Sequence, residues 1–200
     1  MRVSAPVCQD RRVSAPPDLP PVVSRALDLS RRRGFVSSTR NETGRLLAAL
    51  AATRSGTLAE CGTGCGVGSA WLRSGVRGDA RIITAELDHR LAEAVRTMFE
   101  DDRQVEVLQA DWTTLRDHAP FSLLFLDVRE AKQNPPEFLT ELVEPGGIVV
   151  LDDFTPFEGW PPVYEGRVDI TRQQWLTDER FTTAEVMVAV DAAVLIATRR

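Results

Sequence analysis

The sequence has few of the residues that stabilise secreted proteins. Its 200 residues include three cysteines, Cys8, Cys61 and Cys65. A small and odd number of cysteines provides no disulfide framework, so we expect a reducing, cytoplasmic environment. No apolar signal core is present near the N-terminus. A run of roughly 18 apolar residues, which a membrane-spanning helix needs, is also absent, so we expect no membrane segment.

An excess of positive charge is missing as well. The chain has 24 basic and 29 acidic residues, and its net charge is −5. This balance gives no general electrostatic reason to bind nucleic acid, which we therefore do not expect as a partner. Lys132 is the only lysine among the basic residues. Hydrophobic residues make up 43% of the chain, which is typical of a folded globular protein.

The length and the distribution of proline indicate one domain with an irregular N-terminal segment. Residues 1–19 contain the pentapeptide Arg-Val-Ser-Ala-Pro twice and are rich in proline, so we expect a flexible tail there. Residues 20–200 are long enough to form a single domain with its own core. The length does not reveal the oligomeric state, although base rates favour a homodimer.

Apolar runs that fit strands alternate with segments that fit helices. Strands are predicted at residues 57–61, 81–86, 105–109, 122–127, 148–152, 183–188 and 193–198. Helices are predicted at residues 21–33, 67–74, 88–99, 112–117, 136–143 and 171–176, and a capping box from Thr39 to Glu42 opens one more. The pattern predicts a doubly wound, Rossmann-like α/β fold. Its seven-stranded sheet is mostly parallel, with the last strand antiparallel because only residues 189–192 join the final two strands.

A glycine-rich turn follows the first predicted strand. Its sequence is Glu60-Cys-Gly62-Thr63-Gly64-Cys-Gly66, and a helix is predicted directly after it. Glycines allow a ligand to approach the backbone, and a helix N-terminus offers free N–H groups. The glycine spacing fits neither a dinucleotide fingerprint nor a phosphate-binding loop with its lysine. The two cysteines inside the turn are interpreted as small packing residues rather than a metal or redox pair.

Acidic residues end the next two predicted strands. Glu86 ends the strand at 81–86, where a carboxylate can accept both hydroxyls of a ribose. Asp111 follows the strand at 105–109, where it can accept from an adenine amino group, and Trp112 can pack on the ring. A helix N-cap is an almost equally good interpretation of Asp111.

These features resemble the class I S-adenosylmethionine-dependent methyltransferases over residues 35–200. The resemblance implies that S-adenosylmethionine is the cofactor and that a small molecule accepts the methyl group. It places the methionine moiety at Glu60 and the backbone of the glycine turn, the ribose at Glu86 and the adenine at Asp111. The cofactor-binding residues it implies are Ser37, Glu60, Gly62, Thr63, Gly64, Gly66, Glu86, Leu87, Asp111, Trp112 and Asp127.

Three further carboxylates follow the fourth and fifth core strands. Asp127 ends one strand, and Asp152 and Asp153 end the next. Ligands of open parallel sheets lie at these carboxyl ends, so the three side chains are expected to converge. Oxygen ligands of this kind suit Mg²⁺, Mn²⁺ or Ca²⁺. The alternative interpretation is a pair of strand-end residues that contacts the cofactor or caps a turn.

The surrounding residues narrow the resemblance to the cation-dependent small O-methyltransferases of the catechol and caffeoyl-CoA type. This resemblance implies that Asp127, Asp152 and Asp153 hold a divalent cation, which activates a hydroxyl of the acceptor. Two positions depart from the family: Asp153 stands where an asparagine is usual, and Glu130 stands where many members have a catalytic lysine. Arg129 and Lys132 flank that position, and either can supply positive charge. We assign the catalytic roles to Asp127 and Arg129.

Aromatic residues gather in the segment after Asp153. Phe154, Phe157, Trp160 and Tyr164 lie within eleven residues of a chain that is only 6% aromatic. Such a loop can grip a planar acceptor, with Trp160 and Tyr164 as the candidate contacts. Anchoring of a long loop, or a dimer contact, explains the same composition.

The sequence thus predicts a divalent-cation-assisted O-methyltransferase that acts on a small hydroxylated, aromatic acceptor. A metal-independent methyltransferase with another acceptor, including tRNA, is the alternative enzyme. A module that binds S-adenosylmethionine without catalysis is the alternative outside enzymes. The failed glycine spacing argues against a nicotinamide-dependent oxidoreductase.

Overall fold

The computed structural model describes residues 18–200, and most of the predicted N-terminal tail, 1–19, lies outside this range. Its helices are α1 (Pro21–Arg33), α2 (Asn41–Ala51), α3 (Val67–Gly75), α4 (His89–Met98), the 3₁₀ helix η1 (Trp112–His118), α5 (Arg129–Lys132), α6 (Pro136–Thr140) and α7 (Ile170–Thr177). Its strands are β1 (Thr57–Cys61), β2 (Arg81–Glu86), β3 (Val105–Gln109), β4 (Phe121–Leu126), β5 (Val143–Phe154), β6 (Val163–Tyr164), β7 (Arg167–Val168), β8 (Phe181–Ala189) and β9 (Ala192–Arg199).

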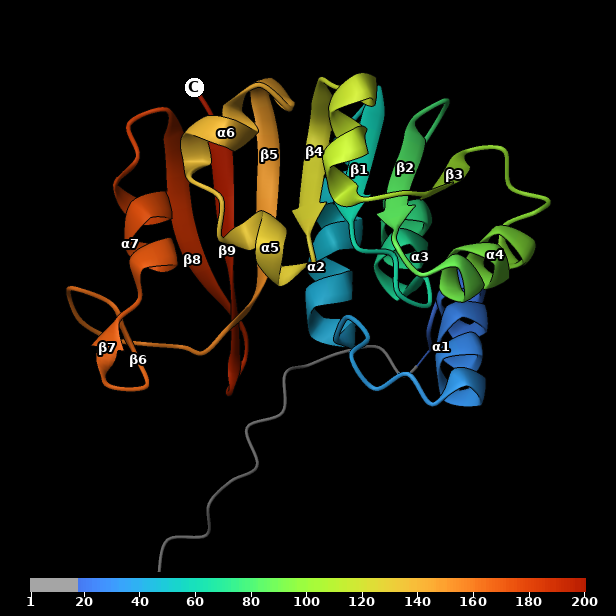
Figure 1. Cartoon of the computed structure of the whole chain (residues 1–200), viewed down its shortest axis with the longest axis horizontal. Coiled ribbons are helices and arrows are strands. Elements are labelled where there is room, and N and C mark those ends of the chain that lie inside the picture. The colour runs from blue at the N-terminus through green and yellow to red at the C-terminus, as the bar shows by residue number, and fades with distance from the viewer. Residues whose placement is uncertain (1–17) are drawn as a thin grey trace, which may run out of the picture.

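One seven-stranded sheet organises the molecule, as Figure 1 shows. The strand order is β3-β2-β1-β4-β5-β9-β8. Strands β1 to β5 pair in parallel, whereas β9 is antiparallel to both β5 and β8. The predicted doubly wound sheet with a reversed last strand is confirmed. The winding of the chain reverses between β1 and β4, and open α/β sheets bind their ligands at such a point.

The sheet is buried on both faces because alternate strand residues point in opposite directions. Leu58 of β1 and Val150 of β5 pack in one core with α1, α2, α3 and α4. Ala59 of β1 and Leu151 of β5 pack in a second core with η1, α5, α6 and α7. Strand β4 is fully buried along its length, as its apolar run predicts. The result is three layers, with helices covering both sides of the sheet.

Two glycines fix the close packing of α2 against α3. A Cβ at Gly44 would overlap the Trp71 ring, and a Cβ at Gly75 would overlap the backbone of Ala48. This close contact sets the height of α3 over the sheet, and the glycine turn leads directly into α3. No helix among residues 18–200 combines the length and apolar character needed to cross a membrane.

The structure differs from the sequence prediction in the region after β4. A four-residue helix, α5, follows β4 where no helix was predicted, and the predicted loop 153–168 contains the β6–β7 hairpin. Both elements are too short for periodicity to be visible in the sequence. The predicted helix at 136–143 ends at Thr140, because Val143 already belongs to β5.

Candidate active site

The glycine-rich turn crosses over the carboxyl end of β2. Gly62, Gly64 and Gly66 have φ angles of 92°, 53° and 78°, a left-handed conformation that glycine adopts without strain. The N–H groups of Gly62 and Thr63 both donate to the Ala85 carbonyl at the end of β2. A Cβ at Gly62 would overlap the Val128 side chain beyond β4. Glycine is therefore required here by both conformation and space.

Glu86 lies beside this turn, as the sequence predicts. Its Oε2 accepts a 2.8 Å hydrogen bond from the Gly64 N–H, and its Oε1 accepts one of 2.8 Å from the Asp88 N–H. These bonds hold the carboxylate in place while leaving lone pairs for further donors. The side chain is half-buried, so a ligand can still reach it.

A cavity of about 340 Å³ opens at the ends of β1, β2 and β3. Five predicted cofactor-binding residues line it: Gly62, Glu86, Leu87, Asp111 and Trp112. Leu87 is 73% exposed, which is unusual for a leucine and leaves an apolar surface beside two carboxylates. The size and the mixture of an apolar wall with few polar groups are those of a small-molecule site.

Asp111 is a helix N-cap, which is one of the two interpretations that the sequence leaves open, and it also lines the cavity. Its Oδ1 caps η1 by accepting hydrogen bonds from the Thr113 N–H at 2.9 Å and the Thr113 hydroxyl at 2.6 Å. These bonds lower the pKa of Asp111. The same side chain is exposed and lines the cavity. It is thus a fixed, negatively charged acceptor at the end of β3.

Glu60 is fully buried under α3 and does not line this cavity. Its Oε2 accepts hydrogen bonds from the hydroxyls of Ser69 and Thr84, the latter at 2.8 Å. Its Oε1 is buried without a hydrogen-bond partner. Burial raises the pKa of Glu60 to about 7, against the opposing effect of the two hydroxyls. A carboxylate with one unsatisfied oxygen can accept a donor from a ligand, or carry a proton near neutral pH.

The predicted capping box before α2 is wrong. The residue that precedes the helix is Arg40, and no side chain caps it. Thr39 instead directs its hydroxyl to Asp127 Oδ2 at 3.4 Å. Long-range contact with the end of β4 has therefore replaced a local cap. Ser37, predicted to contact the cofactor, is exposed and does not line the 340 Å³ cavity.

Asp127 occupies the centre of the strand-end carboxylates. Burial is the main reason that its pKa lies well above the ordinary value, and the charges of Glu60, Asp152 and Asp153 raise it further. Lys132 acts in the opposite direction. Asp127 therefore binds protons more readily than an exposed aspartate does.

Asp152 and Asp153 do not converge as the sequence predicts. Asp152 is buried on the α2 face of the sheet, where it accepts a 3.1 Å hydrogen bond from the Thr43 hydroxyl. Asp153 is exposed and forms a 3.1 Å ion pair with Lys132. Lys132 belongs to α5, which covers the other face of the sheet. The pairing of β5 with β9 is irregular between Leu151 and Phe154, and Asp153 has a φ of 67°. Consecutive strand residues point to opposite faces, and this bulge does not bring them together.

The predicted metal centre of Asp127, Asp152 and Asp153 is corrected accordingly. Within residues 18–200, no group of three or more histidine, cysteine, aspartate or glutamate side chains is arranged to hold a metal ion. The carboxylates are near enough to raise each other's pKa, but they do not share one coordination sphere. Carboxylate oxygens suit a hard cation chemically; the Lys132 ammonium, however, already lies against Asp153. The residues do not fit a bound divalent ion.

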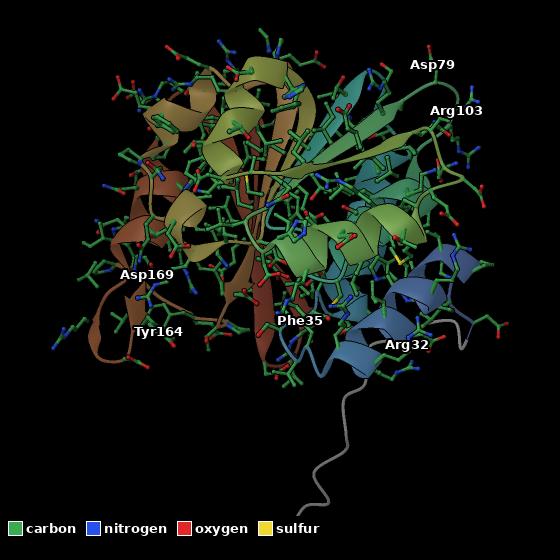
Figure 2. The ribbon with its side chains drawn as sticks, turned by 45° about the vertical axis from the view of Figure 1, so that its right-hand side comes forward. Arg32, Phe35, Asp79, Arg103, Tyr164 and Asp169 are labelled. Atoms are coloured by element: carbon green, nitrogen blue, oxygen red, sulfur yellow. The ribbon has the colours of Figure 1, made fainter. Side chains whose placement is uncertain are left out.

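A second cavity, of about 490 Å³, lies between α5, the end of β5 and the β6–β7 hairpin. Arg129, Lys132, Asp153, Phe154 and Tyr164 are among its lining residues. Trp160, predicted as a substrate contact together with Tyr164, is 61% exposed and does not line this cavity. Tyr164 and Asp169 lie close together at the lower edge of the molecule in Figure 2, and Phe35 lies at the same edge. Asp79 and Arg103, which precede β2 and β3, mark the opposite edge.

Arg172 of α7 holds the wall of the second cavity. Its side chain is 2% exposed and forms ion pairs with Asp169 at 3.3 Å and Glu185 at 3.4 Å. Its Nη2 donates to the Thr155 carbonyl at 2.6 Å, and the guanidinium lies 5.2 Å from the centre of the Phe154 ring. One buried cation thus ties the segment after β5 to α7 and β8. Sequence reasoning missed this residue because arginine in a short helix is usually solvated.

The two cysteines in the glycine turn are buried free thiols, as their interpretation as packing residues requires. Burial is the main cause that raises the pKa of both. The arginines at the end of α1 do not form a uniform basic surface. Two of them, Arg32 and Arg33, border a hollow of about 1070 Å³ whose lining also contains Asp28, Glu93, Glu100, Asp101 and Asp102.

The comparisons with known proteins agree with this geometry. Residues 59–154 match a family model described as a methyltransferase domain. This part of the chain, slightly less than half of it, is similar to a methyltransferase domain. This match and the fold confirm the resemblance to class I S-adenosylmethionine-dependent methyltransferases.

Among curated proteins, the chain is 36% identical over 124 residues to a protein of Mycolicibacterium vanbaalenii that has an O-methyltransferase name. The match covers 54% of this chain and 52% of that protein, so the chain spans about half the length of the curated relatives it matches. A relative from a Mycobacterium species is 35% identical over 124 residues, covering 54% of this chain and 53% of its own.

Solved structures share the fold over nearly the whole chain. An O-methyltransferase from Bacillus cereus in complex with S-adenosylhomocysteine has a TM-score of 0.71 and 19% identity, covering 92% of this chain and 93% of its own. An O-methyltransferase from Streptomyces achromogenes in complex with S-adenosylmethionine has a TM-score of 0.71 and 21% identity, covering 92% of each chain.

Proposed function

We propose that the protein is an S-adenosylmethionine-dependent O-methyltransferase that acts on a small hydroxylated, aromatic molecule. The observation that carries the proposal is the junction of the two cavities beyond β4. Val128 lines the cavity of the glycine turn, and the next residue, Arg129, lines the cavity of the β6–β7 hairpin. A donor in the first cavity and an acceptor in the second would meet beside Asp127. Methyl transfer depends mainly on such positioning.

The first cavity has the features that adenosine requires. Glu86 supplies fixed carboxylate oxygens for the ribose hydroxyls, and Leu87 and Trp112 supply apolar surface for the adenine. The unsatisfied Glu60 Oε1, with the backbone of Gly62–Gly66 and Ser37, is assigned to the methionine end. The cofactors bound to the two solved O-methyltransferases support this assignment.

The second cavity suits a planar acceptor with a polar group. Phe154 and Tyr164 provide aromatic surface, and Arg129 and Lys132 provide positive charge close to it. In the transfer, the hydroxyl oxygen of the acceptor bonds to the methyl carbon while the C–S bond breaks. The electron pair of the broken C–S bond stays on sulfur, which gives S-adenosylhomocysteine. The hydroxyl proton passes to Asp127, whose raised pKa suits it to this role.

We do not assign a divalent cation to this reaction, because the strand-end carboxylates do not fit one. The test is turnover: the protein is incubated with S-adenosylmethionine and a panel of catechols and other phenols, and S-adenosylhomocysteine and methylated product are measured by mass spectrometry. We expect product only with a hydroxylated acceptor, and a much lower kcat for Asp127→Asn with unchanged cofactor affinity. Methylation of amines or tRNA instead, with no phenol methylated, would contradict the proposed acceptor.

A further inference from the structure

The only lysine of the chain lies at the strand-end carboxylates. Helix α5 places Lys132 beside the end of β5, and its side chain is 13% exposed. The Nζ atom lies 3.1 Å from Asp153 Oδ2 and 3.1 Å from the Asp152 carbonyl oxygen. An ammonium group has three N–H donors, and these two contacts use two of them. Because Lys132 lines the 490 Å³ cavity, the remaining donor is available to a molecule bound there.

The carboxylates at this edge lie close enough to affect one another's charge. Burial, together with the charges of Glu60, Asp152 and Asp153, raises the pKa of Asp127, and burial raises that of Asp152. The positive charge of Lys132 lowers the pKa of both carboxyl groups and so opposes these shifts. Arg129, the first residue of α5, lines the same cavity, but it is exposed. Lys132 is therefore the cation in direct contact with Asp153 among the described residues.

We propose that Lys132 is the built-in cation of the acceptor site: its ammonium occupies the place beside Asp153 that a divalent ion would need, and directs its free N–H to the acceptor oxygen. The inference rests on the proposed function for the identity of the acceptor. The contacts of Lys132 with Asp152 and Asp153 do not depend on that function. The same charge that keeps a metal ion out neutralises the carboxylates next to the methyl acceptor.

Two features of the fold support this arrangement. The left-handed conformation of Asp153, with a φ of 67°, places its carboxylate on the α5 side of β5. Asp152 is held away by Thr43 on the α2 side. A divalent ion would need both carboxylates in one sphere, whereas an ammonium needs only one carboxylate and a nearby carbonyl. The local backbone thus suits lysine better than a metal ion.

The experiment uses Mn²⁺ alone as the probe, with the full chain and no cofactor or acceptor present. Free Mn²⁺ is measured by electron paramagnetic resonance during titration of wild type, Lys132→Ala and Lys132→Arg. We expect Lys132→Ala to bind Mn²⁺ about tenfold more tightly than wild type, because the positive charge that repels Mn²⁺ has been removed. Lys132→Arg keeps a cation and should bind no better than wild type. Arg129→Ala is the matched control, since it removes a cation of the same cavity that does not contact Asp153.

A second variant ties the gain to the proposed contact. In Lys132→Ala combined with Asp153→Asn, the added Mn²⁺ affinity should disappear. If Lys132→Ala does not fold, Lys132→Met replaces it, because methionine retains the length of the side chain. Tight Mn²⁺ binding by wild type, or no gain in Lys132→Ala or in its substitute Lys132→Met, would overturn the inference. These readouts do not involve methyl transfer, so failure of the proposed function would show separately as absence of turnover by wild type.

Discussion

The cofactor half and the acceptor half of the site are built in different ways. The cofactor half consists of turns that directly follow β1, β2 and β3, so Gly62, Glu86 and Asp111 come from three consecutive strand ends. The acceptor half combines α5, the end of β5, the β6–β7 hairpin and α7, which are separated by up to 43 residues between Arg129 and Arg172. Local motifs define the first half, and contacts between distant segments define the second.

The difference shows which chemistry the fold fixes. The glycine turn and Glu86 are locked by backbone hydrogen bonds, so their position follows from the sheet itself. Lys132, Arg172 and Tyr164 instead depend on how a long segment packs after β5. Specificity that depends on such segments can change while the sheet stays the same. We therefore expect changes in the first half to weaken cofactor binding, and changes in the second to alter acceptor selection.

The largest expected effect concerns the buried charge under the cofactor half. The pKa of Glu60 is raised from 4.5 to about 7 by burial. Burial favours the neutral, protonated form of Glu60. Its contribution to the free energy of unfolding is therefore complete below pH 4.5 and is lost as the pH rises to about 7. We expect Glu60→Gln to become more stable relative to wild type by about 3 kcal/mol between these limits. Chemical unfolding at several pH values measures this, and a difference that is constant with pH would contradict it.

The next effect tests whether space in the glycine turn is required. Gly62→Ala should weaken S-adenosylmethionine binding about 100-fold, because the new Cβ overlaps Val128 and displaces the turn. Gly78→Ala is the matched control: its φ is also positive, at 63°, but a Cβ there meets nothing within 4 Å. Both variants are strained by about 1–2 kcal/mol in the left-handed region. An equal loss of cofactor affinity in the two variants would show that backbone strain, and not the space at Gly62, causes the loss.

A smaller effect is expected in the acceptor half. Tyr164→Ala should raise the KM for the acceptor about tenfold through loss of aromatic contact, while the affinity for S-adenosylmethionine stays the same. Tyr164→Phe retains the ring and should behave like wild type. Trp160→Ala should change KM less than Tyr164→Ala does, since Trp160 does not line the cavity. Steady-state kinetics with a phenol that the enzyme methylates decides the order, and a larger effect at Trp160 would contradict this assignment of the acceptor cavity.

The smallest effect concerns the ion pair that joins α2 to the turn before β9. Arg40 donates to both carboxylate oxygens of Asp191, at 2.8 and 3.1 Å, but the two side chains are 50% and 63% exposed. Solvent screens exposed ion pairs, so Arg40→Ala should lower the free energy of unfolding only slightly. Chemical denaturation measures it. A much larger loss would mean that this contact carries the junction between α2 and the reversed strand.

Much of the fold could be predicted from the sequence because its signals are local. Each of the seven main strands lies within a few residues of its predicted position, and α1 was placed correctly by its prolines and Gly34. The glycine turn, Glu86 and Asp111 lie together because they end neighbouring strands, which the alternation of strands and helices implies.

The acceptor half could be predicted only in part. Asp152 and Asp153 are adjacent in sequence, but the bulge in β5 and the contacts with Thr43 and Lys132 decide which way each points. Thr39 fitted a capping box locally, and its bond to Asp127 spans 88 residues. Lys132 could be identified from the sequence as a cation near the position of the missing family lysine, but its contacts with Asp152 and Asp153 could not. Long-range contacts of this kind leave no periodic pattern in the sequence.

The most direct test of the account is calorimetric titration of S-adenosylmethionine into wild type and Glu86→Gln. The central claim is that the cavity beside the glycine turn holds the cofactor, with Glu86 as acceptor for the ribose hydroxyls. We predict saturable binding with one site, and an affinity about tenfold lower for Glu86→Gln because a charged acceptor is lost. Absence of binding to wild type, or equal binding to both proteins, would contradict the account.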